Sequence, residues 1–417
     1  MSFTSGDWLV EALRPYAEVH RVVGVARVSG PKAAASEGAI GLVGSVDRVL
    51  LRMTDAGGNA VDTPVVVKER KDNYLVNSSM QGGWDYFKTE ITAYSRILPL
   101  IGGLLKDTGE EIFWPECLGY REHDKLVLED LKVQGYEPTV SLPPGLDLEE
   151  ATLVVRSLAK YHAASAVLIE RGRIDVDTLQ EAPYCGKLEV FNRILAMSMT
   201  AVAKYGRLMW PESGQRYADM LENMLPRMEA ELKRICGRSK AGWSVINHGD
   251  TWLMNFMFKY DSLRKPTSII LSSNRIIDYQ IVNYNSFASD LTQLIYSSLT
   301  TANRRLHYDA LMSSYREQLH RTLGLLGWPE DKLPTEDLLR SEMDDFRFLG
   351  LVVTMITVPV VMAGDRVPLP SDGERLEGRT SSFEMRAKNP LFMDHMLSLM
   401  KEFDKAGILK PLDYAEN

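Results

Sequence analysis

The sequence predicts an α+β fold, in which a small antiparallel sheet with one helix comes first and a large, mostly helical part follows. Runs rich in β-branched residues, with turn signals between them, fill residues 1–131. Long amphipathic patterns of helical period fill most of residues 132–417. A chain of 417 residues, 45% of them hydrophobic, is long enough for two such lobes. We therefore expect a boundary near residues 131–132.

The first lobe is expected to open with a helix over residues 8–16 and to contain its main helix over residues 83–98. Pro99 should end that main helix, because proline lacks the backbone N–H that a helix interior needs. Asp55-Ala-Gly-Gly-Asn59 is a turn signal between two strands. The expected strands cover residues 19–28, 46–53, 64–68, 113–120 and 125–131.

The second lobe is expected to be helical apart from short strands and turns over residues 245–279. An apolar helix should begin near Phe348 and end near Val358, before Pro359. The polar stretch over residues 365–388 reads as a loop. Further helices are expected over residues 148–170, 186–205, 215–236 and 391–406, the last of them ended by Gly407.

The strongest chemical signal is His248-Gly-Asp250-Thr-Trp-Leu-Met-Asn255, which follows an apolar strand. An Asp five residues before an Asn has the D-x-x-x-x-N spacing of a kinase catalytic loop. The Asp250 carboxylate would take the proton of an attacking hydroxyl, and Asn255 would reach a magnesium ion beside the phosphates. We expect His248 to hold backbone groups of this loop rather than to act as a base.

Asp278 supplies a second signal, because it follows the β-branched pair Ile276-Ile277 at a strand end. Magnesium prefers oxygen ligands from few side chains, completed by phosphates. Asn255 and Asp278 are therefore the predicted metal ligands, although an Asp that caps a turn after a strand is also common.

Lys68 ends a valine run, and Glu90 lies on the helix that follows. Phosphoryl transfer needs a cation on the phosphates of ATP, and a strand lysine held by a helix glutamate supplies it. Taken alone, Lys68 reads more readily as a solvent-exposed lysine at a strand end than as a functional residue. Its pairing with Glu90 and the order of the motifs favour the functional interpretation.

Two further segments complete the predicted nucleotide site. Gly38-x-x-Gly41-x-x-Gly44-Ser45 is a glycine-rich connection whose backbone N–H groups could approach phosphates, although glycine-rich hairpins are frequent. Glu129 and Leu131 lie at the predicted junction of the lobes, where backbone groups would bind adenine. All these elements follow one another in the order found in kinases, so the sequence predicts an ATP- and magnesium-dependent kinase with a two-lobed protein-kinase-like fold.

These motifs also resemble those of the ecdysteroid kinase-like family, which is related to choline and aminoglycoside kinases. This chain has Asp278-Tyr-Gln where the family usually shows D-F-Q, and tyrosine keeps the ring. Its glycine-rich segment keeps Ser45 but lacks the usual Asn. The stretches that carry the resemblance are Val127–Leu131, Leu158–Ser165, His248–Asn255, Ile277–Gln280 and Ser289–Leu291.

The resemblance implies an ATP:alcohol phosphotransferase with Asp250 as base and a lipophilic, ecdysteroid- or steroid-like alcohol as substrate. It gives Asp290 the role of a helix cap or of a partner for the catalytic loop, and His162 is expected only to pack. Two alternatives stay open, which are a choline- or aminoglycoside-type kinase and a catalytically inactive kinase-like binding protein.

Composition narrows the remaining possibilities. The formal net charge of −8 disfavours nucleic-acid binding. The longest apolar run, residues 348–364, is too short for a membrane span. Three well-separated cysteines and an N-terminus that does not resemble a signal peptide favour a reducing, cytoplasmic location. A monomer is the expected oligomeric state.

Overall fold

The structure is a computed structural model, and its described residues divide into two compact units. Unit 1 consists of Met1–Pro138 and Asn255–Ile281, and unit 2 of Thr139–Met254 and Val282–Asn417. Unit 1 thus takes in a segment that lies well beyond residue 131 in the sequence. The described residues are 8–20, 22–28, 44–70, 77, 83–139, 145–182, 184, 189–238, 243–260, 274–363 and 382–409.

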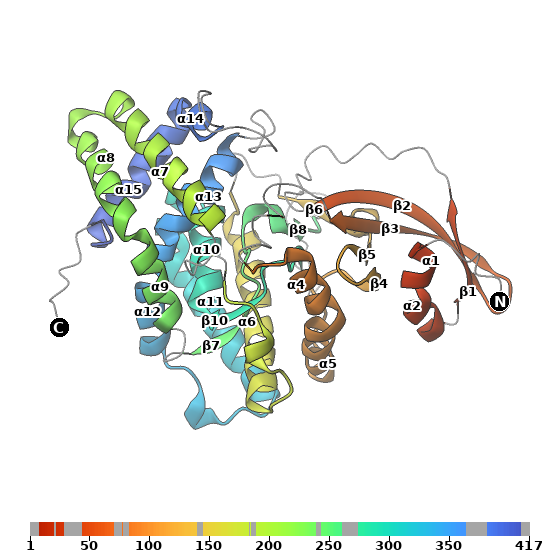
Figure 1. Ribbon diagram of the computed structural model, residues 1–417. Helices are drawn as coiled ribbons and strands as arrows, with labels where there is room; N and C mark the ends of the chain where they lie inside the picture. The colour runs from red at the N-terminus through yellow and green to blue at the C-terminus, as the bar shows by residue number, and fades with distance from the viewer. Residues whose placement is uncertain are drawn as a thin grey trace. The chain divides into compact units, whose positions relative to one another are not determined.

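Unit 1 contains a five-stranded antiparallel sheet, drawn in red to orange in Figure 1. Side chains alternate between the two faces of a strand, so Val65 and Val67 point into a buried core while Lys68 points to the opposite face. The strand order is β1 (Val22–Val28), β2 (Gly44–Asp55), β3 (Ala60–Arg70), β5 (Lys125–Glu129) and β4 (Cys117–Arg121).

The two short helices α1 (Trp8–Ala12) and α2 (Arg14–Val19) cover one face of this sheet, since Leu9 and Leu13 pack in the same core as Val65. The sequence predicted one helix here, but the chain forms two. The predicted turn between β2 and β3 is confirmed. Its Asp55 carboxylate accepts hydrogen bonds from the backbone of Gly57 and Asn59.

The main helix of unit 1 does not end at Pro99, and that prediction was wrong. Helix α4 (Tyr86–Thr92) continues through a π-helical turn over Ala93–Ile97 into α5 (Leu98–Asp107). Pro99 lies inside this continuous helix, directly after the π-helical turn, in which the Leu98 amide donates to the Ala93 carbonyl five residues earlier.

A second, three-stranded sheet in unit 1 joins segments that are far apart in sequence. Its order is β6 (Glu137–Pro138), β8 (Phe256–Phe258) and β9 (Asn274–Ile276), and both pairings are antiparallel. Asn255 directly precedes β8 and Asp278 lies two residues after β9, so both residues lie at the same end of this antiparallel pair.

Unit 2 is mostly helical, and its described residues include a small antiparallel sheet, formed by β7 (Ser244–Asn247) and β10 (Asn283–Ser286). Its longest helices, α6 and α11, pack against each other. The helices are α6 (Leu148–Glu170), α7 (Glu189–Met209), α8 (Glu212–Met224), α9 (Met228–Arg238), α10 (Ala288–Ser298), α11 (Thr301–Leu325), α12 (Glu336–Asp345), α13 (Arg347–Ala363), α14 (Ser382–Ala387) and α15 (Pro390–Lys405).

The predicted end of α13 near Val358 was wrong, because the helix runs through Pro359. A proline inside a helix leaves the carbonyl four residues earlier without its usual donor. That carbonyl belongs to Met355, and the Ser198 hydroxyl on α7 donates to it at 2.5 Å. A neighbouring helix therefore replaces the lost hydrogen bond.

The expected polar loop over residues 365–388 is described only in part. Residues 364–381 lie outside the described residues, and residues 382–387 form helix α14 instead of a loop. The helix expected over 148–170 is confirmed to the residue, and its N-terminus carries a capping box between Asp147 and Glu150.

No helix in the described part of the chain combines the length and the apolar character that a membrane crossing demands.

Gly119 in β4 gives a test of the contact between the sheet and the N-terminal helices. A Cβ atom there would lie 2.2 Å from the backbone oxygen of Ala12. We expect Gly119→Ala to lower the free energy of unfolding by about 1–3 kcal/mol, as overpacking does. Urea titration followed by far-UV circular dichroism measures the change.

Gly103→Ala is the matched control, because nothing lies within 4 Å of the Cβ position in that exposed turn of α5. It should keep or raise stability, since alanine favours a helix over glycine by up to about 1 kcal/mol. Equal urea midpoints for Gly119→Ala and the wild type would contradict the packing described above.

Candidate functional site

Three residues predicted from distant parts of the sequence meet in unit 1. The Lys68 ammonium on β3 lies 2.6 Å from Glu90 Oε1 on α4 and 2.6 Å from Asp278 Oδ1, which follows β9. The side chains of Lys68, Glu90 and Asp278 are 13%, 2% and 26% exposed. The lysine is thus a partly buried cation held between two carboxylates, and Asp278 is the member most open to solvent.

The charges in this cluster shift one another. Burial alone lowers the pKa of Lys68, but the carboxylates of Asp278 and Glu90 outweigh it and hold the pKa above its ordinary value. The pKa of Glu90 is raised to about 7, because burial outweighs the lowering by the Lys68 ammonium and the Asp278 carboxylate adds a smaller increase. Lys68 therefore stays charged at neutral pH.

Local backbone structure brings Asn255 and Asp278 to one end of the β8–β9 pair. The ladder pairs Phe256 with Ile276, and beyond it the Ile277 amide donates to the Asn255 carbonyl at 3.0 Å. Asp278 then adopts a left-handed backbone conformation with φ +71°, which Asp tolerates better than most residues. The chain therefore turns at Asp278 directly after the strand.

Tyr279 anchors this turn in the core of unit 1. It is 1% exposed, and its ring makes edge contacts with Tyr94 and Trp114 at centroid distances of 5.6 and 6.4 Å. An aromatic ring next to Asp278 was expected from the sequence, and the structure shows what that ring packs against.

The donor atoms at this end fit a magnesium ion. Asn255 and Asp278 offer an amide oxygen and a carboxylate, which are ligands that Mg²⁺ accepts. Within the described ranges, no group of three or more His, Cys, Asp or Glu side chains could hold a metal by itself. A magnesium bound here would therefore need further oxygen ligands, such as phosphates.

The segment after β5 is held by side chains that the sequence analysis did not single out. Arg48 on β2 forms an ion pair with Asp130, with Nε and Nη2 at 2.6 and 2.5 Å from Oδ2. Asp130 is buried, and its Oδ1 accepts a hydrogen bond from the Lys132 amide. Asp130 thereby caps the start of the 3₁₀ turn Leu131–Gln134. The Asp at the start of this turn was the available signal, because Asp commonly caps such turns.

The two residues predicted to meet adenine lie on either side of Asp130. The Glu129 carboxylate accepts from the Glu116 amide at 2.9 Å and from Gln134 Nε2 at 2.5 Å. Leu131 packs in an apolar cluster with Tyr136 and Met257, to which Ile277 adds a partly buried side chain. This segment is therefore fixed by both polar and apolar contacts.

The predicted phosphate loop is described only at its end. Gly41 lies outside the described residues. Gly44 and Ser45 begin β2, paired in register with Arg70 and Glu69, and the Ser45 hydroxyl contacts the Glu69 carbonyl at 3.5 Å. Ser45 is thus part of a strand, one residue from the Val46–Lys68 pair.

The predicted base, Asp250, lies on a loop of unit 2 that the first turn of helix α10 holds. The Asp290 carboxylate at the start of α10 accepts from the amides of His248 at 2.7 Å and Gly249 at 2.8 Å. Gly249 has φ +80°, so the loop turns at a residue without a side chain. Asp250 itself is half-buried.

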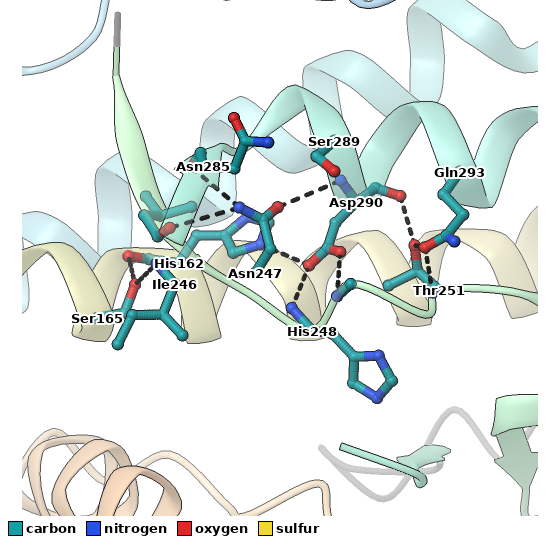
Figure 2. A network of polar contacts seen from close by, with 12 residues as sticks. His162, Ser165, Ile246, Asn247, His248, Thr251, Asn285, Ser289, Asp290 and Gln293 are labelled. Carbon is teal, nitrogen blue, oxygen red and sulfur yellow. Dashed lines mark hydrogen bonds and ion pairs between the residues drawn. The ribbon is translucent and has the colours of Figure 1, made fainter. Parts of the chain in front are cut away.

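The residue after Asp250 is held by the same helix. The Thr251 hydroxyl donates to the Asp290 carbonyl at 2.7 Å, and the Thr251 amide donates to Gln293 Oε1 at 2.6 Å (Figure 2). Asp290 and Gln293 are three residues apart and share one face of the helix. The sequence-based expectation that Asp290 is a partner of this loop agrees with these contacts.

His248 makes the backbone contact expected of a structural residue. Figure 2 shows its ring pointing away from Asp290. Its Nδ1 accepts from the Asp250 amide at 3.2 Å.

His162 on α6 does more than pack, so the expectation for it was incomplete. It is fully buried, with Nε2 at 3.1 Å from Asp290 Oδ2 and Nδ1 at 2.8 Å from the Tyr315 hydroxyl. One turn later, Ser165 accepts from the Ile246 amide at 3.1 Å. The polar pair His162 and Ser165 on an apolar helix was the signal available in the sequence.

The raised pKa of Glu90 predicts a pH effect in unit 1. A carboxyl that keeps its proton longer in the folded state contributes stability below its unfolded pKa of 4.5, and loses it as pH rises through about 7. Asp278→Asn removes one cause of the shift. We expect this variant to lose less stability than the wild type between about pH 5 and pH 8, by about 1 kcal/mol.

Chemical denaturation across this pH window measures the difference, with Asp62→Asn as control. Asp62 is an exposed carboxylate in the same unit whose pKa is lowered by its hydrogen bond to Arg52, so it stays ionised throughout the window. Identical pH slopes for Asp278→Asn and the wild type would rule out the described coupling.

The chain is similar to a macrolide 2′-phosphotransferase from Brachybacterium faecium, with 14% identity, a TM-score of 0.31, and coverage of 86% of this chain and 98% of that one. It is similar to spectinomycin phosphotransferase APH(9)-Ia, with 12% identity, a TM-score of 0.32, and coverage of 88% and 92%. It is also similar to aminoglycoside phosphotransferase APH(2″)-Ib, with 11% identity, a TM-score of 0.30, and coverage of 83% of this chain and 98% of that one.

No curated protein matches the chain in sequence. The model of the ecdysteroid kinase-like family matches residues 43–328, which is most of the chain. That span contains the β2–β5 sheet, the Lys68 cluster and the Asp250 loop. With its antiparallel N-terminal sheet and large helical C-terminal part, the chain has a protein-kinase-like fold and belongs to the ecdysteroid kinase-like family.

Proposed function

We propose that this protein is an ATP-dependent kinase that transfers the γ-phosphoryl group of ATP to a hydroxyl of a small molecule. The observation that carries the proposal is the Lys68 ammonium held at 2.6 Å from both Glu90 and Asp278. Membership in a kinase-like family supports it. Cations fixed in advance stabilise the charge of a transferring phosphoryl group, and this cluster keeps Lys68 charged.

Unit 1 would bind the nucleotide, as proposed for the lobe over residues 1–131. Lys68 would neutralise the phosphates, and Glu90 would keep its ammonium in place. Gly41, Gly44 and Ser45 would contact the phosphates through the backbone. The adenine ring of ATP would bind at the segment from Glu129 to Leu131, where Leu131 already packs in the apolar cluster with Tyr136.

Asn255 and Asp278 would hold magnesium, which would screen the negative charge of the phosphates when bound. To bind magnesium, the Asp278 carboxylate would have to give up its ion pair with Lys68. Its 26% exposure makes it the accessible member of the cluster.

Asp250 would act as the base. As the substrate oxygen attacks the γ-phosphorus, a P–O bond forms, the bond to ADP breaks, and the hydroxyl proton passes to the Asp250 carboxylate. The loop carrying Asp250 is fixed by hydrogen bonds from two of its amides to Asp290, so the carboxylate would need little reorganisation.

For the substrate we propose a lipophilic, ecdysteroid- or steroid-like alcohol, and the family description supports this class. Helices α7 and α13, with their large buried apolar faces, are the proposed lining of its site. A choline- or aminoglycoside-type substrate and a catalytically inactive binding role are the alternatives that the experiments below separate. We further propose a cytoplasmic monomer.

Magnesium-dependent ATP binding is the first test. Saturating ATP with magnesium should raise the unfolding temperature of the wild type, because a ligand at 100 times its Kd adds about 2.7 kcal/mol of stability. Asp278→Ala should lose most of this shift. The exposed-site variant Asp62→Ala should keep it, and an unchanged melting curve for the wild type with ATP and magnesium would leave the inactive binding role as the better account.

The chemical step is tested by Asp250→Asn. Removing a general base should lower the rate of ADP release by about 100- to 10,000-fold while ATP binding persists. Asp219→Asn, which changes an exposed carboxylate on α8, should leave the rate unchanged. Full turnover by Asp250→Asn would contradict the assigned role.

Substrate class is read from products. Ecdysteroids, aminoalcohols and aminoglycosides are each incubated with enzyme, magnesium and ATP, and phosphorylated products are sought by mass spectrometry. We expect the ecdysteroids to be phosphorylated. Phosphorylation of aminoalcohols or aminoglycosides alone would assign the alternative kinase type.

A further inference from the structure

The buried carboxylate of Asp290 is shared between the Asp250 loop and helix α6. It is fully buried, and it accepts three hydrogen bonds, from the amides of His248 and Gly249 and from His162 Nε2. A buried carboxylate is costly unless donors surround it. The imidazole of His162 is the one side-chain donor among these three, so it helps to decide how the carboxylate is oriented.

The contacts of His162 define a directional chain of hydrogen bonds. An ionised Asp290 can only accept, so His162 Nε2 carries the proton of that contact. In the neutral ring Nδ1 is then an acceptor, and the Tyr315 hydroxyl donates to it at 2.8 Å. Asp290 thereby sets the tautomer of His162, and the Tyr315 hydroxyl, which can donate or accept, holds the other ring nitrogen.

Tyr315 is itself held rigidly in unit 2. It is fully buried on α11, and its ring stacks on Phe287 with centroids 5.4 Å apart. Phe287 directly precedes α10, the helix that carries Asp290. The hydrogen bonds from Tyr315 through His162 to Asp290 therefore connect helices α11, α6 and α10 to the two backbone amides that precede Asp250.

We propose that His162 and Tyr315 are positioning residues for phosphoryl transfer, which act through Asp290 on the loop that carries Asp250. The proposal rests on the proposed function, because it concerns the base of that reaction. The polar contacts of the His162 and Tyr315 side chains described above lie within unit 2, whereas those of Lys68, Glu90 and Asp278 lie within unit 1. Loss of His162 or Tyr315 should therefore slow turnover without weakening ATP binding.

Three variants test the hydrogen bonds between Tyr315, His162 and Asp290 one at a time. Tyr315→Phe removes only the hydroxyl, and His162→Leu removes both ring contacts. His162→Gln keeps an N–H donor for Asp290 and tests rescue. Tyr217→Phe is the control, since it removes another hydroxyl of unit 2, one whose contacts are with Arg216 and Asp404.

The first readout is hydrogen–deuterium exchange of the peptide that covers the amides of His248 and Gly249. Both amides are bonded to buried Asp290, so they should exchange slowly in the wild type. We expect exchange to be about 10-fold faster in Tyr315→Phe and faster still in His162→Leu, with little change in Tyr217→Phe. Unchanged exchange in Tyr315→Phe, which keeps the buried ring, would overturn the proposal even if His162→Leu fails to fold.

The second readout is steady-state release of ADP from ATP and magnesium, with water as acceptor. We expect kcat to fall about 10-fold in Tyr315→Phe and about 100-fold in His162→Leu, with KM for ATP unchanged and partial recovery in His162→Gln. A purely structural role would lower the amount of folded enzyme and its melting temperature, but not kcat per folded molecule.

Asp250→Asn in the same assay distinguishes the two proposals. If Asp250→Asn lowers turnover and the His162 and Tyr315 variants do not, the positioning role is overturned while the proposed function stands. If the wild type releases no ADP with water or with any of the acceptors tested above, or Asp250→Asn is fully active, the proposed function fails and the positioning role fails with it.

Discussion

The constraint on which the candidate site depends is that a buried charge must have partners. Lys68 keeps its ammonium in a partly buried place only because Glu90 and Asp278 each lie 2.6 Å away. This pairing joins β3, α4 and the end of the β8–β9 pair. Along the chain, Glu90 is 22 residues and Asp278 is 210 residues from Lys68. The same rule operates in unit 2, where buried Asp290 has donors from α6 and from the loop before Asp250.

The two charged clusters differ in a way that suits their proposed roles. Asp278 is one-quarter exposed and has a left-handed backbone, so it lies where a ligand could reach it. Asp290 is fully buried and faces backbone amides, so it can order a loop but cannot meet a substrate. One carboxylate is therefore suited to binding and the other to support.

Elements that depend on local pattern were predicted well from the sequence. The helix over 148–170 was predicted with its correct ends, because its apolar period lies within the segment and its capping residue, Asp147, directly precedes it. Both proline predictions failed, for reasons that lie outside the local pattern. Pro99 follows a π-helical turn within a continuous helix, and Pro359 is tolerated because Ser198 on another helix bonds the Met355 carbonyl.

The sequence by itself determined the order of the motifs, the residue types at each position and the local turns that present them, because these depend on neighbours within a few residues. The tertiary structure decided which side chains meet. It placed Asp278 on Lys68, paired Arg48 with Asp130, and gave His162 the partners Asp290 and Tyr315. Such contacts join residues tens to hundreds of positions apart, and only folding brings them within hydrogen-bonding distance.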